Sequence, residues 1–305
     1  MAAAKDSNVR GDLRFNEPMH KHTTWRVGGP ADVFFRPSDL DDLVAYVADT
    51  DDAANALWVG LGSNLLVRDG GYRGVVIATH RALSGFEQLS EYVLRVGAGE
   101  PCAKVAKRCA TLGIGPAEFF AGIPGTVGGA LAMNAGAFDG ETWRFVREVE
   151  TLDAKGTLRT RPADEFAVGY RSVEAPAPEW FVSATCEINA HDGDSKQANR
   201  ELRVKRKATQ PIGEPSCGSV FRNPPGDFAA RLIEATGLKG LRVGGAQVSP
   251  MHANFIVNTG DASASDIEAL LHLVRSAVAD RFDVWLHPEV RIVGEFQRPD
   301  TGAEG

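Results

Sequence analysis

The apolar residues of the chain repeat with helical spacing in some segments and with strand-like spacing in others. A helix is predicted to begin at Ser38, because the apolar residues between 40 and 47 recur every three or four positions and form one stripe. The clearest predicted helix opens with a capping box of Ser265 and Glu268. Its expected buried face consists of Ile267, Leu270, Leu271, Val274, Val278 and Phe282.

Short runs rich in β-branched residues predict strands between the helices. We expect strands at 57–60, 75–78, 92–96, 149–152, 181–188, 219–222, 254–258 and 284–293. Further helices are predicted at 101–113, 196–207 and 228–236. Helices and strands therefore mix without a regular βαβ order, and no internal repeat is present, so the pattern favours an α+β fold.

Composition and charge narrow the class of protein. The 305 residues, of which 43% are hydrophobic and 24% charged, suffice for two or three globular domains. A formal net charge of -7 argues against general binding to nucleic acid. The four cysteines form no CxxC pair and no Cys/His metal spacing, so we expect reduced thiols and no metal site.

The first residues show no targeting pattern. Residues 1–10 lack the basic start and apolar core of a signal peptide. No apolar run approaches the roughly 20 residues that span a bilayer. We therefore expect a cytoplasmic protein without membrane contact.

Glycine-rich segments give the first chemical signal. Gly60-Leu61-Gly62-Ser63-Asn64 directly follows a predicted strand, so its backbone could approach an anion while Ser63 and Asn64 donate to phosphate oxygens. The segment is not the GxGxxG dinucleotide fingerprint, which is absent from this sequence. Taken alone, it is explained equally well as a tight turn.

A longer glycine-rich segment runs from Phe119 to Ala130 and continues to Gly136, with five glycines between Gly122 and Gly136. Such a segment can lie flat beneath a large planar ligand and present backbone N–H groups to a pyrophosphate. A glycine-rich packing loop is the alternative. A third glycine-containing segment at 26–29 favours binding of a large dinucleotide over the packing-loop alternative.

Six blocks of the sequence resemble the UDP-N-acetylenolpyruvoylglucosamine reductase (MurB) family. Three look like its flavin-binding signatures: TWRVGGPA from Thr24, GLGSNLLV from Gly60 and GIPGTVGGALAMNAGA from Gly122. Three resemble its catalytic blocks, in the family's order: Tyr170-Arg171-Ser172, GSVFRNP from Gly218 and HPEV from His287. The resemblance spans about residues 22–293, and the absence of a long insertion indicates the shorter family subtype.

This resemblance implies a flavoprotein with three regions. Residues 1–80 and 81–205 would form an FAD-binding unit of two subdomains like that of the vanillyl-alcohol oxidase (PCMH-like) group. Residues 206–289 would form an α+β substrate domain. A strand at about 290–298 would return to the first subdomain, and residues 296–305 would be a disordered tail.

The same resemblance implies an oxidoreductase of peptidoglycan precursor synthesis, and thus a role in cell wall biogenesis, cell shape and cell division. NADPH would reduce non-covalently bound FAD, which carries the hydride. UDP-N-acetylglucosamine enolpyruvate would then accept the hydride at its terminal methylene carbon. Negative charge would spread from the neighbouring carbon into the carboxylate until a proton completes UDP-N-acetylmuramate. No obligate protein partner is implied.

Three residues of the resembling blocks match these chemical needs. Arg171 is permanently cationic, and its planar fork could hold the substrate carboxylate and favour the charged intermediate. Glu289, if protonated beside that carboxylate, could donate a hydrogen bond to it. Ser219 would be the proton donor, an assignment that rests on the family motif because an aliphatic hydroxyl is a poor acid in water. Outside these blocks, the three would be a surface ion-pair residue, a turn carboxylate and the start of a strand.

Ligand-binding residues are also implied by the resemblance. Those expected to bind the cofactor are Arg26, Gly28, Gly60, Gly62, Ser63, Asn64, Gly122, Gly125, Thr126, Gly128 and Asn134. Those expected to bind the substrate are Tyr170, Lys207, Asn223, His252 and Asn254. Lys207 lies in a basic stretch that could equally be a solvated helix face. Met251 and Arg222 stand where the family commonly has lysine.

Two other classes of function stay open. A flavin oxidase would pass electrons to oxygen and often tethers FAD through a histidine, but no histidine lies in GLGSN or GIPGTVGG. A non-enzymatic UDP-sugar-binding regulator would keep the fold without the chemistry, yet Arg171, Ser219 and Glu289 are all present.

Overall fold

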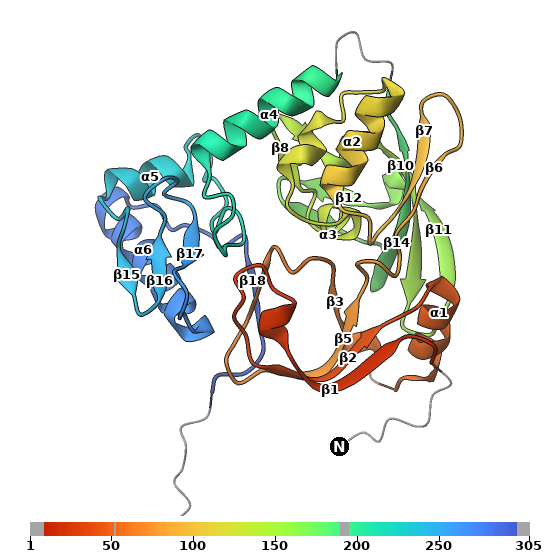
Figure 1. The fold of residues 1–305 in the computed structure, drawn as a ribbon, viewed down its shortest axis with the longest axis horizontal. Coiled ribbons are helices and arrows are strands. Elements are labelled where there is room, and N and C mark those ends of the chain that lie inside the picture. The colour runs from red at the N-terminus through yellow and green to blue at the C-terminus, as the bar shows by residue number, and fades with distance from the viewer. Residues whose placement is uncertain (1–8, 52, 190–194, 298–305) are drawn as a thin grey trace, which may run out of the picture. The chain divides into compact units, whose positions relative to one another are not determined.

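The computed structural model describes residues 9–51, 53–189 and 195–297, drawn as coloured ribbon in Figure 1. The chain divides into two compact units, which we describe separately. Unit 1 comprises Met1–Phe15, Val33–Leu61 and Gly74–Arg206, and unit 2 comprises Asn16–Asp32, Gly62–Arg73 and Lys207–Gly305. Helices and strands mix in both units, as the predicted α+β class requires. The expected three regions stay a prediction, and most of the expected tail lies outside the described residues.

Helices occur in both units. The α-helices of the described residues are α1 (Leu40–Asp49), α2 (Cys102–Leu112), α3 (Val127–Ala132), α4 (Ser195–Thr209), α5 (Ala229–Ala235) and α6 (Ala264–Phe282). Short 3-10 helices are η1 (Met19–Lys21), η2 (Ala53–Asn55), η3 (Glu118–Gly122), η4 (Thr142–Phe145) and η5 (Ala163–Glu165). Within the described residues, none of the helices has the length and apolar character that a membrane span requires.

The strands form two larger sheets and several small ones. A sheet in the order β1-β2-β5-β3 contains β1 (Asp12–Pro18), β2 (Pro30–Arg36), β3 (Leu57–Val59) and β5 (Tyr72–Ala78). A sheet in the order β11-β10-β14-β7-β6 contains β6 (Phe86–Gln88), β7 (Val93–Gly97), β10 (Val146–Asp153), β11 (Leu158–Pro162) and β14 (Glu179–Glu187). The small sheets contain β4 (Leu65–Val67) with β18 (Arg291–Val293), β8 (Gly136–Ala137) with β9 (Gly140–Glu141), β12 (Ala167–Gly169) with β13 (Ser172–Glu174), and β15 (Arg242–Val243), β16 (Ala246–Val248) and β17 (Ile256–Asn258).

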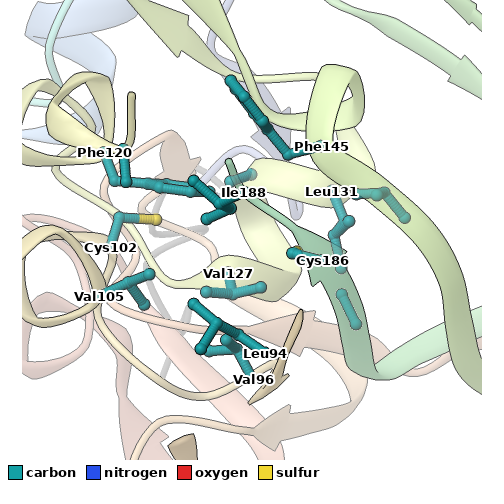
Figure 2. Close-up of a cluster of buried hydrophobic side chains, with 14 of the residues drawn as sticks. Leu94, Val96, Cys102, Val105, Phe120, Val127, Leu131, Phe145, Cys186 and Ile188 are labelled. Carbon is teal, nitrogen blue, oxygen red and sulfur yellow. The ribbon is translucent and has the colours of Figure 1, made fainter. Parts of the chain in front are cut away.

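The main core of unit 1 lies between the antiparallel five-stranded sheet and α2, η3 and α3. Figure 2 shows this cluster, in which Cys102 and Val105 of α2 and Val127 and Leu131 of α3 gather with sheet residues such as Leu94. The apolar residues of the glycine-rich segment thus pack into the core of unit 1 and hold the segment in place. As predicted, α2 starts after Pro101 and ends where Gly113 takes a left-handed φ of 70°.

A second core of unit 1 surrounds α1. Of the stripe that predicted this helix, Leu43 and Val47 are buried in a cluster that includes Phe35, and the other two residues are partly buried against it. The helix cap is Asp39 rather than Ser38, because the Asp39 carboxylate accepts a hydrogen bond of 2.9 Å from the Asp42 N–H group.

The core of unit 2 is built on α6. Its predicted buried face is confirmed from Ile267 to Val278, while Phe282 is only partly buried. The predicted capping box is wrong by two residues: Ser263 and Asp266 form it. The reason lies outside the local sequence, because the carboxylate of Asp69 accepts hydrogen bonds from the N–H groups of Ala264 and Ser265 and fixes an earlier start.

Most predicted strands occur with shifted ends, but two predictions fail. Residues 219–222 form no strand, and 284–293 contributes only β18, which pairs in parallel with β4. The two segments instead meet at one isolated bridge between Phe221 and Pro288. In a strand ladder, the backbone of a neighbouring strand would bond to Phe221. Here the side chain of Asn254 bonds to the N–H and carbonyl groups of Phe221 instead. The sequence pattern also missed β1 and β2 and the edge strands β6 and β11.

Candidate active site

Arg171 lies at the tip of a short hairpin in unit 1. Gly169 of β12 pairs with Ser172 of β13, so Tyr170 and Arg171 form a two-residue turn. Arg171 has a φ of 53°, in the left-handed region that favours glycine. Its guanidinium carbon lies 5.2 Å from the centroid of the Tyr170 ring.

Backbone carbonyl groups hold the guanidinium of Arg171. Nη2 donates to the Gly136 carbonyl at 2.9 Å, and Nη1 donates to the Asn134 carbonyl at 3.3 Å. A Cβ atom on Gly136 would stand 3.3 Å from Arg171 Nη1, so the glycine gives the guanidinium room. Both acceptors are uncharged backbone groups, and the two bonds orient the guanidinium.

Asn134 is buried beside this turn, with 2% of its surface exposed and a φ of 45°. Its Oδ1 accepts from the Trp143 N–H group at 3.2 Å. Its Nδ2 donates to Glu141 Oε2 at 3.0 Å and to the Gly169 carbonyl at 3.1 Å. The expected cofactor contact stays a prediction, since protein groups already engage both ends of the amide.

Ser219 and Glu289 lie on neighbouring backbone segments of unit 2. The Glu289 N–H group donates to the Val220 carbonyl at 2.8 Å, and the Arg222 N–H group donates to the His287 carbonyl at 2.9 Å. Both Ser219 and Glu289 are half-buried. The structure therefore brings together two of the predicted catalytic residues although 70 positions separate them in the sequence.

Asn254 holds the Ser219 segment in place. Its Oδ1 accepts from the Phe221 N–H group at 3.0 Å, and its Nδ2 donates to the Phe221 carbonyl at 2.8 Å. The Asn254 carbonyl also accepts from the Val220 N–H group at 2.9 Å. With 4% of its surface exposed, Asn254 supports the backbone, and its expected contact with the substrate stays a prediction.

Two further residues surround Glu289. Asn64 Nδ2 donates to the Glu289 carbonyl at 3.0 Å, while the Asn64 carbonyl accepts from the Arg291 N–H group at 3.0 Å. The thiol of Cys217 is buried close by. Burial raises its pKa well above the ordinary value, and the Glu289 carboxylate raises it further.

The other expected substrate residues differ in exposure. Lys207 is exposed on α4 and Tyr170 is 49% exposed, so both side chains can be reached from solvent. The Asn223 Oδ1 accepts from the Ala229 N–H group at 3.1 Å, at the start of α5. His252 is half-buried, and desolvation lowers the pKa of its imidazole below the ordinary value.

The glycines of unit 1 serve close packing of loops. A Cβ atom on Gly60 would stand 2.3 Å from Thr126 Oγ1, and one on Gly122 would stand 2.4 Å from the Ala137 side chain. The expectation that this segment presents its N–H groups to a ligand is wrong for two residues. The N–H group of Val127 donates to the Glu100 carbonyl at 2.9 Å, and that of Gly128 donates to the Ala98 carbonyl at 2.8 Å.

The signature residues of unit 2 show the same close packing. Gly62 has a φ of 64°, and a Cβ atom there would stand 2.0 Å from the His22 carbonyl oxygen. Gly28 has a φ of 125° and lies against Val67. Arg26, whose φ is 59°, is exposed, while Ser63 is half-buried.

One residue in unit 1 was missed by the sequence reasoning. Glu100 is 3% exposed, and its Oε1 has no hydrogen-bond partner among the described residues. Pro101, the next residue, bridges Thr126, so Glu100 lies beside the glycine-rich segment. A Cβ atom on Gly129 of the same segment would meet only Thr126 Oγ1, at 3.9 Å, so this glycine faces open space. A glutamate directly before a helix carries no sequence signal that its carboxylate will be a buried acceptor beside a glycine-rich segment.

Comparisons with known proteins complete this description. Residues 31–161 match the model of an FAD binding domain, and residues 210–293 match that of the UDP-N-acetylenolpyruvoylglucosamine reductase C-terminal domain. The UDP-N-acetylenolpyruvoylglucosamine reductase of Alkalilimnicola ehrlichii is 56% identical over 298 residues, covering 97% of this chain and all of that protein. The chain belongs to the UDP-N-acetylenolpyruvoylglucosamine reductase family.

Other members of the family agree with this assignment. The reductase of Methylococcus capsulatus is 55% identical over 297 residues, covering 97% of this chain and 98% of that protein. A solved structure of the reductase (MurB) from Thermus caldophilus superimposes with a TM-score of 0.76 at 31% identity. It covers 93% of this chain and 98% of its own chain. The α+β fold with a flavin-binding part and a separate C-terminal domain is thus the fold of the family.

Proposed function

We propose that the chain reduces UDP-N-acetylglucosamine enolpyruvate to UDP-N-acetylmuramate with NADPH and FAD, in the synthesis of peptidoglycan precursors. The observation that carries this proposal is the presence of an FAD binding domain and the reductase C-terminal domain in one chain. Identity of 56% over almost the full length to a reductase of that name supports it.

The glycine-rich part of unit 1 fits an FAD molecule. Gly129 faces open space, and the buried carboxylate of Glu100 has an oxygen that lacks a donor among the described residues. A buried acceptor without a partner is costly, and the hydroxyl groups of FAD are donors that could satisfy it. Thr126 and Glu100 would hold the cofactor here. FAD, when bound, supplies the transfer of a hydride from NADPH to the substrate.

Arg171 would bind the carboxylate of the substrate. The carbonyl groups of Gly136 and Asn134 hold its two terminal nitrogens in a fixed orientation, and a guanidinium is suited to bind a carboxylate. When hydride adds to the methylene carbon, negative charge develops on the neighbouring carbon and spreads into the carboxylate. A fixed cation stabilises this charge more than it stabilises the ground state, which lowers the barrier.

Ser219 would give its hydroxyl proton to the neighbouring carbon, and Glu289 would hydrogen-bond to the substrate carboxylate. The pairing of Val220 with Glu289 keeps both residues on adjoining segments. A serine hydroxyl is a weak acid, so this step needs a strongly basic carbon as acceptor, which the charged intermediate provides. The overall step adds one hydride and one proton across the double bond of the enol ether.

The cytoplasm is the compartment that we propose for this reaction. The four cysteines are free and buried, which is the usual state of thiols in a reducing compartment. The small-molecule substrate and NADPH account for all the partners that the proposal needs.

The variant Ser219→Ala tests the proton step. Reduction of the flavin by NADPH should stay within about twofold of the wild-type rate, while reoxidation by the substrate should slow about 100-fold or more. The two half-reactions are followed separately by anaerobic stopped-flow absorbance. Ser216→Ala is a matched control, because within the described part of the chain the Ser216 hydroxyl donates only to the Glu214 carbonyl, at 3.3 Å. Equal loss of both half-reactions would contradict the assignment of Ser219.

The same spectra separate the alternative functions. A flavin band that NADPH bleaches and the enolpyruvate substrate restores establishes the cofactor, the hydride donor and the acceptor. A reduced flavin that only oxygen restores would instead favour an oxidase. Binding of the UDP-sugar without consumption of NADPH would favour a regulator.

A further inference from the structure

The hairpin that carries Arg171 has little hydrophobic support of its own. Of residues 167–174, only Arg171 and Val173 are partly buried, and of these Val173 packs against the hydrophobic core. Two paired strands of three residues each are marginal structures in isolation. Catalysis by Arg171 requires a guanidinium held to within a fraction of an ångström, so other contacts must fix it.

The turn at Asn134 supplies these contacts in two ways. Its backbone provides the carbonyl groups of Asn134 and Gly136, which accept from the two terminal nitrogens of Arg171. The side chain of Asn134 donates to the carbonyl of Gly169, which directly precedes the Tyr170-Arg171 turn. The turn therefore holds both the guanidinium and the backbone that carries it.

The side chain of Asn134 is itself fixed. Glu141 Oε2 accepts from Nδ2 at 3.0 Å and the Trp143 N–H group donates to Oδ1 at 3.2 Å, so both ends of the amide have a defined orientation. Asn134 has a left-handed φ of 45°, a conformation that asparagine tolerates better than most residues. Burial excludes water that would compete for these bonds.

We propose that Asn134, oriented by Glu141, is the residue that positions Arg171 for reaction with the substrate. This inference rests on the proposed function, because it acts through the role given to Arg171. It differs from the cofactor contact that the sequence suggested for Asn134, and it makes Asn134 a positioning residue without contact to the reacting atoms.

Asn134→Asp is the sharpest test of this role. The substitution keeps the size of the side chain but replaces the Nδ2 donor with an oxygen that faces Glu141 Oε2 and the Gly169 carbonyl. We expect reoxidation of the flavin by the enolpyruvate substrate to slow about 10- to 100-fold, since small misplacements of a catalytic group have effects of this size. Reduction by NADPH should stay near the wild-type value, whereas the midpoint of thermal unfolding with FAD bound should fall, because a buried oxygen then faces two acceptors.

A double-mutant cycle separates positioning from general damage. If Asn134 acts through Arg171, then Asn134→Asp should change substrate reoxidation by less than about twofold in an Arg171→Ala background. Glu141→Gln should cost little, because the glutamine oxygen can still accept from Asn134 Nδ2. Thr151→Val is the matched control for loss of a buried polar contact in unit 1, and it should leave both half-reactions within about twofold.

The outcomes that overturn the proposal are distinct from failure of the proposed function. Equal slowing by Asn134→Asp in the wild-type and Arg171→Ala backgrounds, or equal loss of both half-reactions, overturns the positioning role alone. If Asn134→Asp does not fold, the same cycle is measured with Asn134→Gly, which removes the side chain and can adopt the same φ. If neither folds with FAD bound, Asn134 is merely structural and the proposal fails. A wild-type enzyme that the substrate does not reoxidise would overturn the proposed function itself.

Discussion

The two units hold their proposed catalytic residues by different means, although each uses a buried asparagine. In unit 2, Asn254 bonds to the backbone of Phe221, and Phe221 and Val220 lie in the hydrophobic core next to Ser219. In unit 1, Asn134 bonds to Gly169 of a largely exposed hairpin, and the guanidinium of Arg171 donates to the carbonyl groups of Asn134 and Gly136. The Ser219 segment is thus fixed by packing and hydrogen bonds together, whereas the Arg171 hairpin depends mainly on hydrogen bonds.

Because of this difference, variants of the two regions should affect the stability of the fold and the rate of the reaction to different extents. A change at Asn254 removes support from a segment of the core, so we expect it to affect the unfolding of unit 2 as well as the reaction. A change at Arg171 acts on a hairpin that contributes little to the core, so its effect should fall mainly on the reaction. Variants of the two regions can therefore be compared directly.

Asn254→Ala should produce the largest loss of stability. It leaves the N–H and carbonyl groups of buried Phe221 without partners, and each such group costs about 1–3 kcal/mol. Asn254→Asp keeps an acceptor for the N–H group but sets a buried oxygen against the Phe221 carbonyl, so it should lose no less stability. Urea unfolding measures both variants. A loss below about 0.5 kcal/mol for Asn254→Ala would show that packing alone holds the segment.

Arg171 allows a smaller and more selective test. Its φ of 53° costs a residue with a Cβ atom roughly 1–2 kcal/mol, which glycine avoids. Arg171→Gly and Arg171→Ala should both slow reoxidation by the substrate strongly while leaving a measurable rate, but the glycine variant should unfold with a free energy about 1 kcal/mol higher than the alanine variant.

Asp283 provides the control for that comparison. It has a nearly identical φ of 55° at the end of α6 and no proposed part in the reaction. Asp283→Gly should likewise exceed Asp283→Ala in stability, and neither change should alter the half-reactions. Equal stabilities for both glycine and alanine pairs would contradict the argument from backbone strain.

The sequence predicted those parts of the fold that local patterns encode. The stripe of α1, the ends of α2 at Pro101 and Gly113, and the buried face of α6 follow from spacing and capping within a few residues. The start of α6 could not be predicted in this way, because Asp69, almost 200 positions earlier, accepts hydrogen bonds from the first turn of the helix. Long-range side-chain contacts of this kind leave no local pattern.

The candidate site was predictable to a similar degree. Sequence blocks indicated Arg171, Ser219 and Glu289, and the fold places two of them on adjoining segments. The sequence could not reveal that the side chains of Asn134 and Asn254 bond to backbone carbonyl groups. An asparagine that binds a ligand and one that bonds to the backbone of a turn look alike in sequence. Glu100 was missed for the same reason: its burial and its unpaired oxygen are properties of the folded chain.

Alkaline pH should distinguish the units by their thiols. Unit 1 buries Cys102, Cys109 and Cys186 in the core of Figure 2, whereas unit 2 buries only Cys217. Burial raises the pKa of Cys109 from the ordinary value of 9.0 to about 12. In the unfolded chain the same thiol ionises near its ordinary pKa, so above that pH the unfolded state loses a proton that the folded state keeps.

The sign of the effect follows from this difference in protons. Because the folded pKa is the higher one, stability is fully present below pH 9.0 and declines as the pH rises toward about 12. For Cys109 alone the loss should be about 1 kcal/mol between about pH 8 and about pH 10. Urea unfolding of the wild type and of Cys109→Ala at both pH values measures it: the variant is less stable at either pH, but its loss on going to high pH should be smaller by that amount. Equal losses would mean that the Cys109 thiol ionises in the folded core as readily as in the unfolded chain.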